Sequence, residues 1–381
     1  RHYTPGGEVI RPYDITSWSL PLHRGLKSHE IKIRDEVFEK KLKPLTGLYN
    51  PLKGAYKLPA VFPVTSNGSF KAAFMAIQNG MEVSRINQEI KADGKVYGKG
   101  SFVLQGSNND LLNSIVKESL TEPGSFRESE KVSLSSVKLP RIALIETYFS
   151  DMDAGWTRYL FDFYKLPFTI LHPDEFEKTD FPGNYDVVIF PSTSKALLMN
   201  GKSGTEASPS MSNYHPDYQK GMGKKGLEKL LLFISEGGKV ISWGQSADLF
   251  TSMLEITRGE TKEEFMLPFT NTADQARKEG LNIPGSLVRL QLKQDNPLTW
   301  GMPAETNVFY RGNPLFNTTI PRFDMDRRVI GAFPEKEILV SGYCEKEEKL
   351  SEKPAMIRIK KGKGELILYS FNPQFRASTQ A

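Results

Sequence analysis

The feature that most constrains the fold is a regular alternation of short apolar strands and helical segments from Arg141 onward. Strand patterns occupy residues 141–148, 168–171, 186–190 and 239–243, and helical patterns occupy residues 153–164, 224–235 and 247–254. Asp186-Val-Val-Ile-Phe190 is almost wholly apolar, as expected for a parallel strand that is buried on both faces. The alternation predicts a doubly wound, flavodoxin-like α/β domain over residues 140–381.

The pattern changes within that domain after about residue 284. Strand-like stretches separated by turns replace the alternation, at residues 286–292, 308–310, 337–341, 355–360 and 365–371. Lys361-Gly-Lys-Gly364 is typical of a hairpin turn. We therefore expect β-rich additions beside the doubly wound sheet.

A small α/β domain is predicted over residues 37–125. Strand patterns at 56–64, 81–86 and 100–104 alternate with helical patterns at 67–78 and 108–120, which predicts a largely parallel sheet. Residues 121–139 are rich in Ser, Glu and Lys and lack apolar periodicity, and residues 126–139 are interpreted as a linker. Residues 1–36 are interpreted as the extended tail of an upstream domain, because residues 11–21 combine aromatic and β-branched residues with two prolines. The start at Arg1, without an initiator methionine, is interpreted as a sign that the chain is a piece of a longer protein.

Composition excludes several classes of protein. The 381 residues suffice for two domains, and 39% hydrophobic with 25% charged residues is typical of a globular chain without a membrane span. A net charge of +5 is too small to predict nucleic-acid binding. The single cysteine, Cys344, excludes an intrachain disulfide and a cysteine-rich zinc site, and five histidines leave little material for a histidine-based catalytic site.

Two short motifs have weak support. His172-Pro-Asp-Glu175 has the spacing of two zinc ligands but lacks a third, so the alternative is the polar end of a strand. Gly221-Met-Gly-Lys-Lys-Gly226 matches a dinucleotide-binding pattern, but no strand precedes it. We interpret it as a glycine-rich helix entry, whose free N–H groups could attract an anion.

Gly244-Gln-Ser246-Ala-Asp248 lies at a strand–turn–helix junction, where a hydrolase nucleophile would lie. No histidine follows His215, which leaves an unusual Ser246–His215 pair as the hydrolytic alternative. The simpler interpretation is that Ser246 caps the helix start. Cys344 lies near a strand end and is interpreted as a buried or incidental thiol.

The segment from Ser150 to Arg158 is the most informative, because it follows the first strand of the doubly wound domain, where such folds bind ligands. Polar side chains here suit a small polar or carboxylate-bearing ligand, with Arg158 as the bidentate partner. The alternative is that Asp153 caps the helix, Trp156 packs and Arg158 pairs with an acid. The candidate binding residues are Glu146, Asp153, Trp156, Arg158, Gln245 and Ser246.

Several irregular motifs resemble the C-terminal region of bacterial zinc-carboxypeptidase-like proteins, which are relatives of carboxypeptidase A. The matching motifs are Pro12-Tyr-Asp-Ile-Thr-Ser-Trp-Ser-Leu-Pro21, Tyr97-Gly-Lys-Gly-Ser-Phe-Val103, Arg141-Ile-Ala-Leu144, Met152-Asp-Ala-Gly-Trp-Thr-Arg158, Gly221–Gly226, Phe233-Ile-Ser-Glu-Gly-Gly238, Pro284-Gly-Ser-Leu287 and Asn372-Pro-Gln-Phe-Arg376. The resemblance implies a class I glutamine-amidotransferase-like domain at the C-terminal end of a long tail.

The resemblance also implies where chemistry is absent. The zinc ligands and catalytic glutamate of such proteins lie in an upstream peptidase domain, so no metal, cofactor or catalytic residue is expected in this chain. The elbow carries Gln245-Ser246 in place of a cysteine, and no late histidine exists, so glutaminase activity is not expected.

We therefore expect a non-catalytic accessory region for ligand binding, docking of the peptidase domain or substrate positioning, in a periplasmic or secreted protein. The alternatives are a hydrolase that uses Ser246 or a metal, and a purely structural interaction module.

Overall fold

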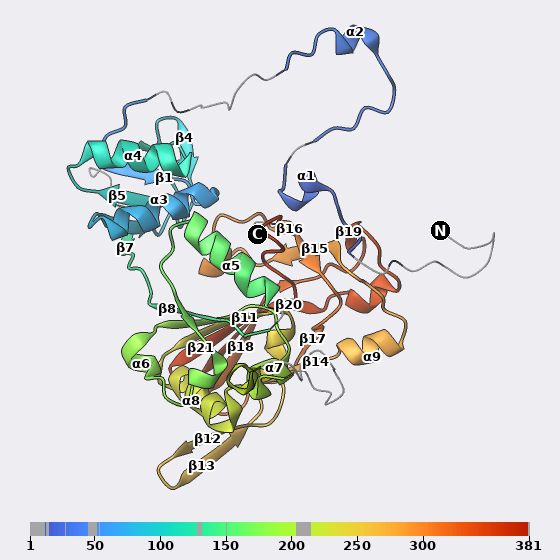
Figure 1. Ribbon diagram of the computed structural model, residues 1–381. Helices are drawn as coiled ribbons and strands as arrows, with labels where there is room; N and C mark the ends of the chain where they lie inside the picture. The colour runs from blue at the N-terminus through green and yellow to red at the C-terminus, as the bar shows by residue number, and fades with distance from the viewer. Residues whose placement is uncertain are drawn as a thin grey trace, which may run out of the picture. The chain divides into compact units, whose positions relative to one another are not determined.

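The computed structural model describes residues 12, 15–26, 28–44, 52, 54–127, 132–149, 151–202 and 215–379. Contacts divide the chain into two compact units, which Figure 1 shows with their labelled elements. The small unit comprises Gly25–Leu139 and Tyr164–Leu166. The large unit comprises Arg1–Arg24, Pro140–Phe163 and Pro167–Ala381.

The small unit has a five-stranded sheet in the order β6-β1-β5-β2-β7. Its strands are β1 (Ala60–Phe62), β2 (Glu82–Ile86), β5 (Phe102–Gln105), β6 (Gly124–Ser125) and β7 (Leu134–Ser136). Its remaining elements are the helices α2 (Glu36–Glu39), α3 (Asn67–Gln78) and α4 (Asn109–Ser119) and the hairpin of β3 (Ile90–Ala92) with β4 (Lys95–Tyr97). One apolar core joins the sheet to α3 and α4 through residues such as Phe62, Ala73 and Ile115.

The prediction of a largely parallel sheet in this unit is wrong. All the pairings among its described strands are antiparallel. Helix α3 does connect β1 to β2, and these two strands run in the same direction because each is antiparallel to β5. However, β5 lies between them, since the chain returns through the β3–β4 hairpin. Strand β7 falls inside residues 126–139, which the sequence suggested as a linker, and pairs with β2.

The large unit contains a ten-stranded mixed sheet. Its parallel half follows the order β9-β8-β10-β11-β21. These strands are β8 (Ile142–Ile145), β9 (Thr169–Leu171), β10 (Val187–Phe190), β11 (Lys239–Trp243) and β21 (Gly364–Tyr369). Counted along the chain, this is the 2-1-3-4-5 order of flavodoxin-like folds, so the predicted doubly wound domain is confirmed.

The β-rich segment between β11 and β21 extends this sheet rather than lying beside it. Beyond β21 the order continues β20-β18-β15-β16, all antiparallel, and β19 also pairs with β15. These strands are β15 (Ser286–Leu292), β16 (Glu305–Tyr310), β18 (Met325–Ala332), β19 (Leu339–Ser341) and β20 (Pro354–Lys361). Two further pairs are β12 (Leu254–Arg258) with β13 (Thr261–Phe265), a hairpin that projects from the unit in Figure 1, and β14 (Phe269–Asn271) with β17 (Phe316–Thr318).

Helix α8 anchors one face of the parallel half. Its apolar side chains Leu230, Phe233 and Ile234 are buried in the main core with residues of β11 and β21. The predicted helix at 247–254 is instead a 3-10 helix that begins at Gly244. The described helices of the large unit are α1 (Leu20–His23), α5 (Met152–Phe163), α6 (Phe181–Asn184), α7 (Lys195–Asn200), α8 (Gly223–Glu236), α9 (Ala273–Lys278), η1 (Pro173–Glu175), η2 (Pro216–Gln219), η3 (Gly244–Phe250), η4 (Pro297–Thr299) and η5 (Glu347–Leu350).

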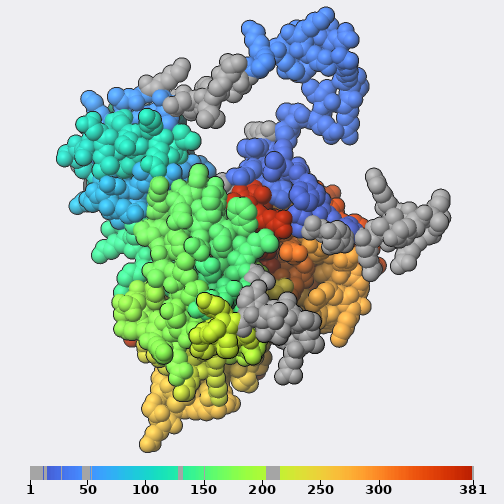
Figure 2. Space-filling model, in the orientation of Figure 1, coloured from blue at the N-terminus to red at the C-terminus, as the bar shows by residue number. Residues whose placement is uncertain are grey.

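Residues 15–24 form an extended segment and a short helix that belong to the large unit. Ile15 is buried in a cluster that includes Phe309 and Phe375. The Thr16 N–H donates to the Gly285 carbonyl at 2.8 Å, and Arg24 donates to the Ala377 carbonyl at 2.7 Å. In Figure 2 this blue segment accordingly lies against the red C-terminal residues. The other extended residues of the predicted tail, from 25 onward, group with the small unit.

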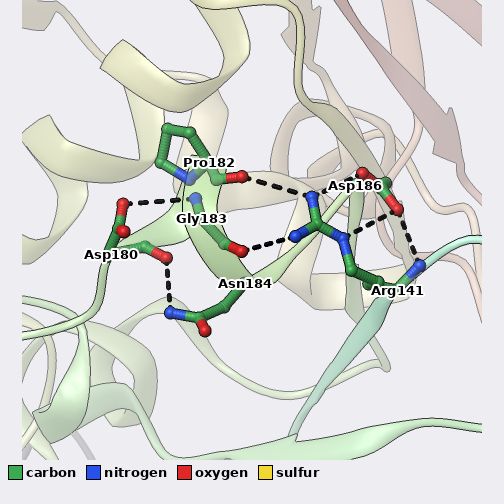
Figure 3. Close-up of polar contacts among 6 residues, drawn as sticks. All are labelled: Arg141, Asp180, Pro182, Gly183, Asn184 and Asp186. Carbon is green, nitrogen blue, oxygen red and sulfur yellow. Dashed lines mark hydrogen bonds and ion pairs between the residues drawn. The ribbon is translucent and has the colours of Figure 1, made fainter.

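An arginine clamp fixes the start of the parallel half, as Figure 3 shows. The Nε and Nη2 atoms of Arg141 donate to the two carboxylate oxygens of Asp186 at 3.2 and 2.8 Å. The same guanidinium donates to the carbonyls of Pro182 and Gly183. This arrangement ties the residue before β8 to the turn before β10, and it lowers the pKa of Asp186.

Within the described residues, every helix is too short or too polar to cross a membrane.

Candidate functional site

A cavity of about 640 Å³ lies at the carboxyl edge of the parallel strands in the large unit. Residues that follow β8, β10, β11 and β21 all contribute to it. The neighbouring strands β8 and β10 flank the point where the strand order reverses, and ligands of doubly wound folds bind at this point. The polar side chains that line the cavity are Asp153, Ser192, Thr193, Ser194, Gln245, Arg277, Asn282, Arg311, Asn313, Asn372 and Arg376.

The turn after β11 brings Gln245 to this cavity. Gly244 has a φ of +58°, which is left-handed, and a Cβ atom at that position would lie 2.2 Å from Ser192 Oγ. Glycine is therefore required for the turn to approach the loop after β10. The Gln245 N–H donates to Ser192 Oγ at 3.1 Å, so the two loops are held together at the cavity wall.

Asp153 supplies a carboxylate from the first turn of α5. Its Oδ2 accepts a hydrogen bond from Asn372 Nδ2 at 2.7 Å, and Asn372 follows β21. Burial raises the pKa of Asp153 to about 6, and the negative charge of Asp151 adds to the increase. The side chains of Trp243, Asn372 and Arg311 oppose it. The cavity therefore contains a partly desolvated acid with a raised pKa.

Three arginines give the cavity a positive wall. Arg311 is exposed, and Arg277 forms an ion pair with Asp274. The guanidinium carbon of Arg376 lies 5.1 Å from the centre of the Phe375 ring, and its buried Nε has no hydrogen-bond partner among the described residues. Guanidinium groups that line one cavity suit a carboxylate or another small oxyanion.

The structure separates the six predicted site residues. Asp153 and Gln245 line the cavity, and the other four do not. Arg158 Nη1 donates to both oxygens of Glu146 at 3.1 and 3.2 Å, which is the acid pairing that the sequence offered as its alternative role. Trp156 is half-buried, and its ring contacts Tyr159 edge-on at 5.9 Å between centroids.

The residue that caps α5 is Asp151 rather than Asp153. Its Oδ2 accepts from the Thr147 N–H at 2.7 Å, and its Oδ1 accepts from the Ala154 N–H at 3.2 Å. Asp153 is consequently not needed for capping and is left to face Asn372 and the cavity.

Ser246 is fully buried and bonded to the loop after β10. Its hydroxyl donates to the carbonyl of Pro191 and accepts from the Thr193 N–H at 2.8 Å. These partners are backbone groups, so the hydroxyl connects two strand ends and is not placed as an activated nucleophile. Cys344 is no better suited, because burial raises the pKa of its thiol to about 12.

The remaining motifs have structural roles. Glu175 accepts from the backbone N–H of His172 at 2.8 Å, and His172 Nδ1 lies 2.8 Å from the Glu146 carbonyl oxygen. His172 and Glu175 therefore form hydrogen bonds that hold the chain just after β9. Gly226 packs against Phe176, where a Cβ atom would approach to 2.9 Å. Within the described ranges, no group of three or more His, Cys, Asp or Glu residues could hold a metal ion.

Sequence reasoning missed Arg311, Arg376 and Asn372 as cavity residues. Asn372 and Arg376 belong to the motif Asn372-Pro-Gln-Phe-Arg376, which in the sequence indicates only a family resemblance. The usable signal was the strand before it, because the carboxyl end of β21 lies at the same edge as those of β8 and β11. Arg311 follows β16, which is an antiparallel strand, so its position after a strand did not predict that it lies at the carboxyl edge of the parallel strands.

A scan against protein families found no match to this chain, and a search of curated proteins found none either. Similar solved structures include a ThuA-like protein from Bacteroides uniformis, at 12% identity and a TM-score of 0.32, covering 62% of this chain and 84% of that one. A glutamine amidotransferase from Thermotoga maritima has 13% identity and a TM-score of 0.32, covering 62% of this chain and 76% of that one.

A β-galactosidase from Bacillus circulans sp. alkalophilus has 12% identity and a TM-score of 0.32, covering 61% of this chain. The match spans only 28% of that enzyme's chain. At these identities the likeness concerns the fold alone.

Proposed function

We propose that this chain is a non-catalytic, ligand-binding accessory region, and that its cavity holds a small molecule or peptide end that carries a carboxylate. The observation that supports the proposal is that three arginines, Arg277, Arg311 and Arg376, line one cavity together with amide and hydroxyl side chains at the carboxyl edge of the sheet. Cavities of several hundred Å³ with a few convergent polar groups are typical ligand sites.

The surroundings of the two candidate nucleophiles, Ser246 and Cys344, support the non-catalytic part of the proposal. The Ser246 hydroxyl is bonded to backbone, and the Cys344 thiol has a raised pKa. Neither arrangement activates the oxygen or sulfur atom for attack. These observations favour binding over the hydrolytic alternative.

We further propose that the region belongs to a zinc-carboxypeptidase-like protein, on the strength of the sequence motifs. The upstream peptidase domain would then be its partner and would hold the zinc, and the protein would be periplasmic or secreted. The gene upstream of Arg1 tests this directly, since it should encode a signal peptide, an H-x-x-E motif and a later histidine.

Binding is tested by titrating the chain with N-acetyl-dialanine, which has a free carboxylate, and with its C-terminal amide. We expect heat of binding with the carboxylate and none with the amide. Arg311→Ala should weaken carboxylate binding at least about tenfold, because a hydrogen bond to a charged group contributes about 1.5–3 kcal/mol.

Arg158→Met is the matched control, because Arg158 contacts Glu146 outside the cavity. It should bind the peptide as the unmodified chain does. The proposal is wrong if the amide binds as well as the acid, or if Arg311→Ala leaves the affinity unchanged.

A further inference from the structure

Among the described residues that line the cavity, Asp153 is the one acidic side chain. The other polar side chains of the lining carry guanidinium, amide and hydroxyl groups. A hydrogen bond from Asn372 holds its carboxylate, and the backbone carbonyl of Asp153 accepts from Gln374 at 3.2 Å. The acid therefore stands at a defined place in an otherwise anion-attracting site.

We propose that Asp153 is the specificity-determining residue of the cavity, and that it selects ligands with one carboxylate and a hydrogen-bond donor over ligands with two carboxylates. This inference rests on the function proposed above. The arginines take the carboxylate, and Asp153 accepts from the donor at the other end of the ligand. A second carboxylate beside Asp153 would place two like charges in a partly desolvated site, which is strongly unfavourable.

The surroundings of Asp153 keep this selection active at neutral pH. The negative charge of Asp151 raises the pKa of Asp153, and the positive charge of Arg311, which also lines the cavity, lowers it. The pKa of Asp153 is about 6, so the carboxylate is largely ionised above neutral pH. Asn372 donates to its Oδ2 atom, and Trp243 also acts on the carboxylate through a side-chain hydrogen bond. Because each carboxylate oxygen can accept more than one hydrogen bond, the group still has acceptor capacity for a ligand.

The test compares succinamate with succinate, because the two probes have the same length and differ in one amide against one carboxylate. Each is titrated into the full chain near pH 8 by calorimetry. We expect succinamate to bind at least about tenfold more tightly than succinate, since a charge-assisted hydrogen bond replaces a repulsion. This preference is measured on the unmodified protein and does not depend on any variant folding.

Asp153→Asn should reduce the preference to about threefold or less, because the neutral amide no longer repels succinate. Glu146→Gln is the matched control, since it removes a carboxylate at the same sheet edge but outside the cavity, and it should leave the preference unchanged.

The outcomes separate the two proposals. If both probes bind the unmodified chain equally, or if succinate binds more tightly, the role of Asp153 is refuted while carboxylate binding stands. A preference that survives in Asp153→Asn also refutes it. If neither probe binds and N-acetyl-dialanine does not bind, the proposed function itself fails.

Discussion

Replacing Asp153 with asparagine should stabilise the large unit at neutral pH and leave it unchanged in acid. Burial raises the pKa of this carboxyl from 3.8 to about 6. Each pKa unit corresponds to about 1.4 kcal/mol, so ionised Asp153 lowers the free energy of unfolding by about 3 kcal/mol relative to its protonated form. Asparagine retains an oxygen that can accept from Asn372 but carries no charge.

The stability of the unmodified chain should fall as pH rises, because the pKa of Asp153 is higher in the folded protein than in the unfolded chain. The folded protein holds the Asp153 proton more tightly than the unfolded chain does. The stabilising contribution of the protonated form is therefore complete below the unfolded pKa of 3.8 and is lost as pH rises through about 6. The unmodified chain should lose stability over this interval relative to Asp153→Asn.

Urea unfolding near pH 4 and near pH 8, followed by tryptophan fluorescence, measures this difference. All four tryptophans, Trp18, Trp156, Trp243 and Trp300, belong to the large unit, so the signal reports that unit alone. The free energy of unfolding of Asp153→Asn should exceed that of the unmodified chain by about 2–3 kcal/mol near pH 8 and by less than about 1 kcal/mol near pH 4.

Glu146→Gln serves as the control for removing an acid from the same sheet edge. The difference in free energy of unfolding between Glu146→Gln and the unmodified chain should be about the same near pH 4 and near pH 8. For Asp153→Asn this difference should increase between the two pH values. An equal effect of Asp153→Asn at both pH values would refute the argument, because the carboxylate would then titrate as an exposed group.

Changes at three further positions test packing in the large unit, two of them beside the cavity and one, Lys361, at the opposite edge of the sheet. Ser246→Ala should lower the free energy of unfolding by about 1–3 kcal/mol, because the buried Thr193 N–H loses its acceptor; an unchanged urea midpoint would contradict this. Gly244→Ala should cost at least about 1–2 kcal/mol from its left-handed φ, in addition to the contact with Ser192, and a thermal midpoint equal to that of the unmodified chain would refute it. Lys361 is 2% exposed and its ammonium pairs with Glu263 and Asp324, which are partly exposed. Because those carboxylates remain open to water, Lys361→Ala should cost about 2–4 kcal/mol mainly through the lost stem, while Lys361→Met should stay within about 1.5 kcal/mol. Equal losses for these two variants, measured by urea unfolding, would show that the charge matters more than the packing.

The parallel core could be predicted because its strands are buried on both faces. Val187–Phe190 and Lys239–Trp243 are short, mostly apolar runs between helical segments, and this pattern leaves few alternatives to a doubly wound sheet. Strand direction in the small unit could not be predicted in the same way. Spacing identifies the helix that connects β1 to β2, but it does not show that a third strand, arriving later in the chain, lies between them.

The arginine wall could not be predicted for a similar reason. Arg311 and Arg376 reach the cavity only because the strands from β15 to β20 extend the sheet before the chain returns as β21. That order depends on which strands pair, and periodicity within a strand does not report pairing. The arginine that the sequence did suggest, Arg158, lay close to Asp153 along the chain and was assigned to the same site for that reason.

Helix geometry explains why these two residues separate. At 3.6 residues per turn, positions 153 and 158 differ by about 140° around the axis of α5, so their side chains leave opposite sides of the helix. Asp153 faces Asn372 and the cavity, while Arg158 faces Glu146. The guanidinium groups that line the cavity with Asp153 therefore come from elements other than α5: Arg277 lies in α9, Arg311 follows β16 and Arg376 follows β21.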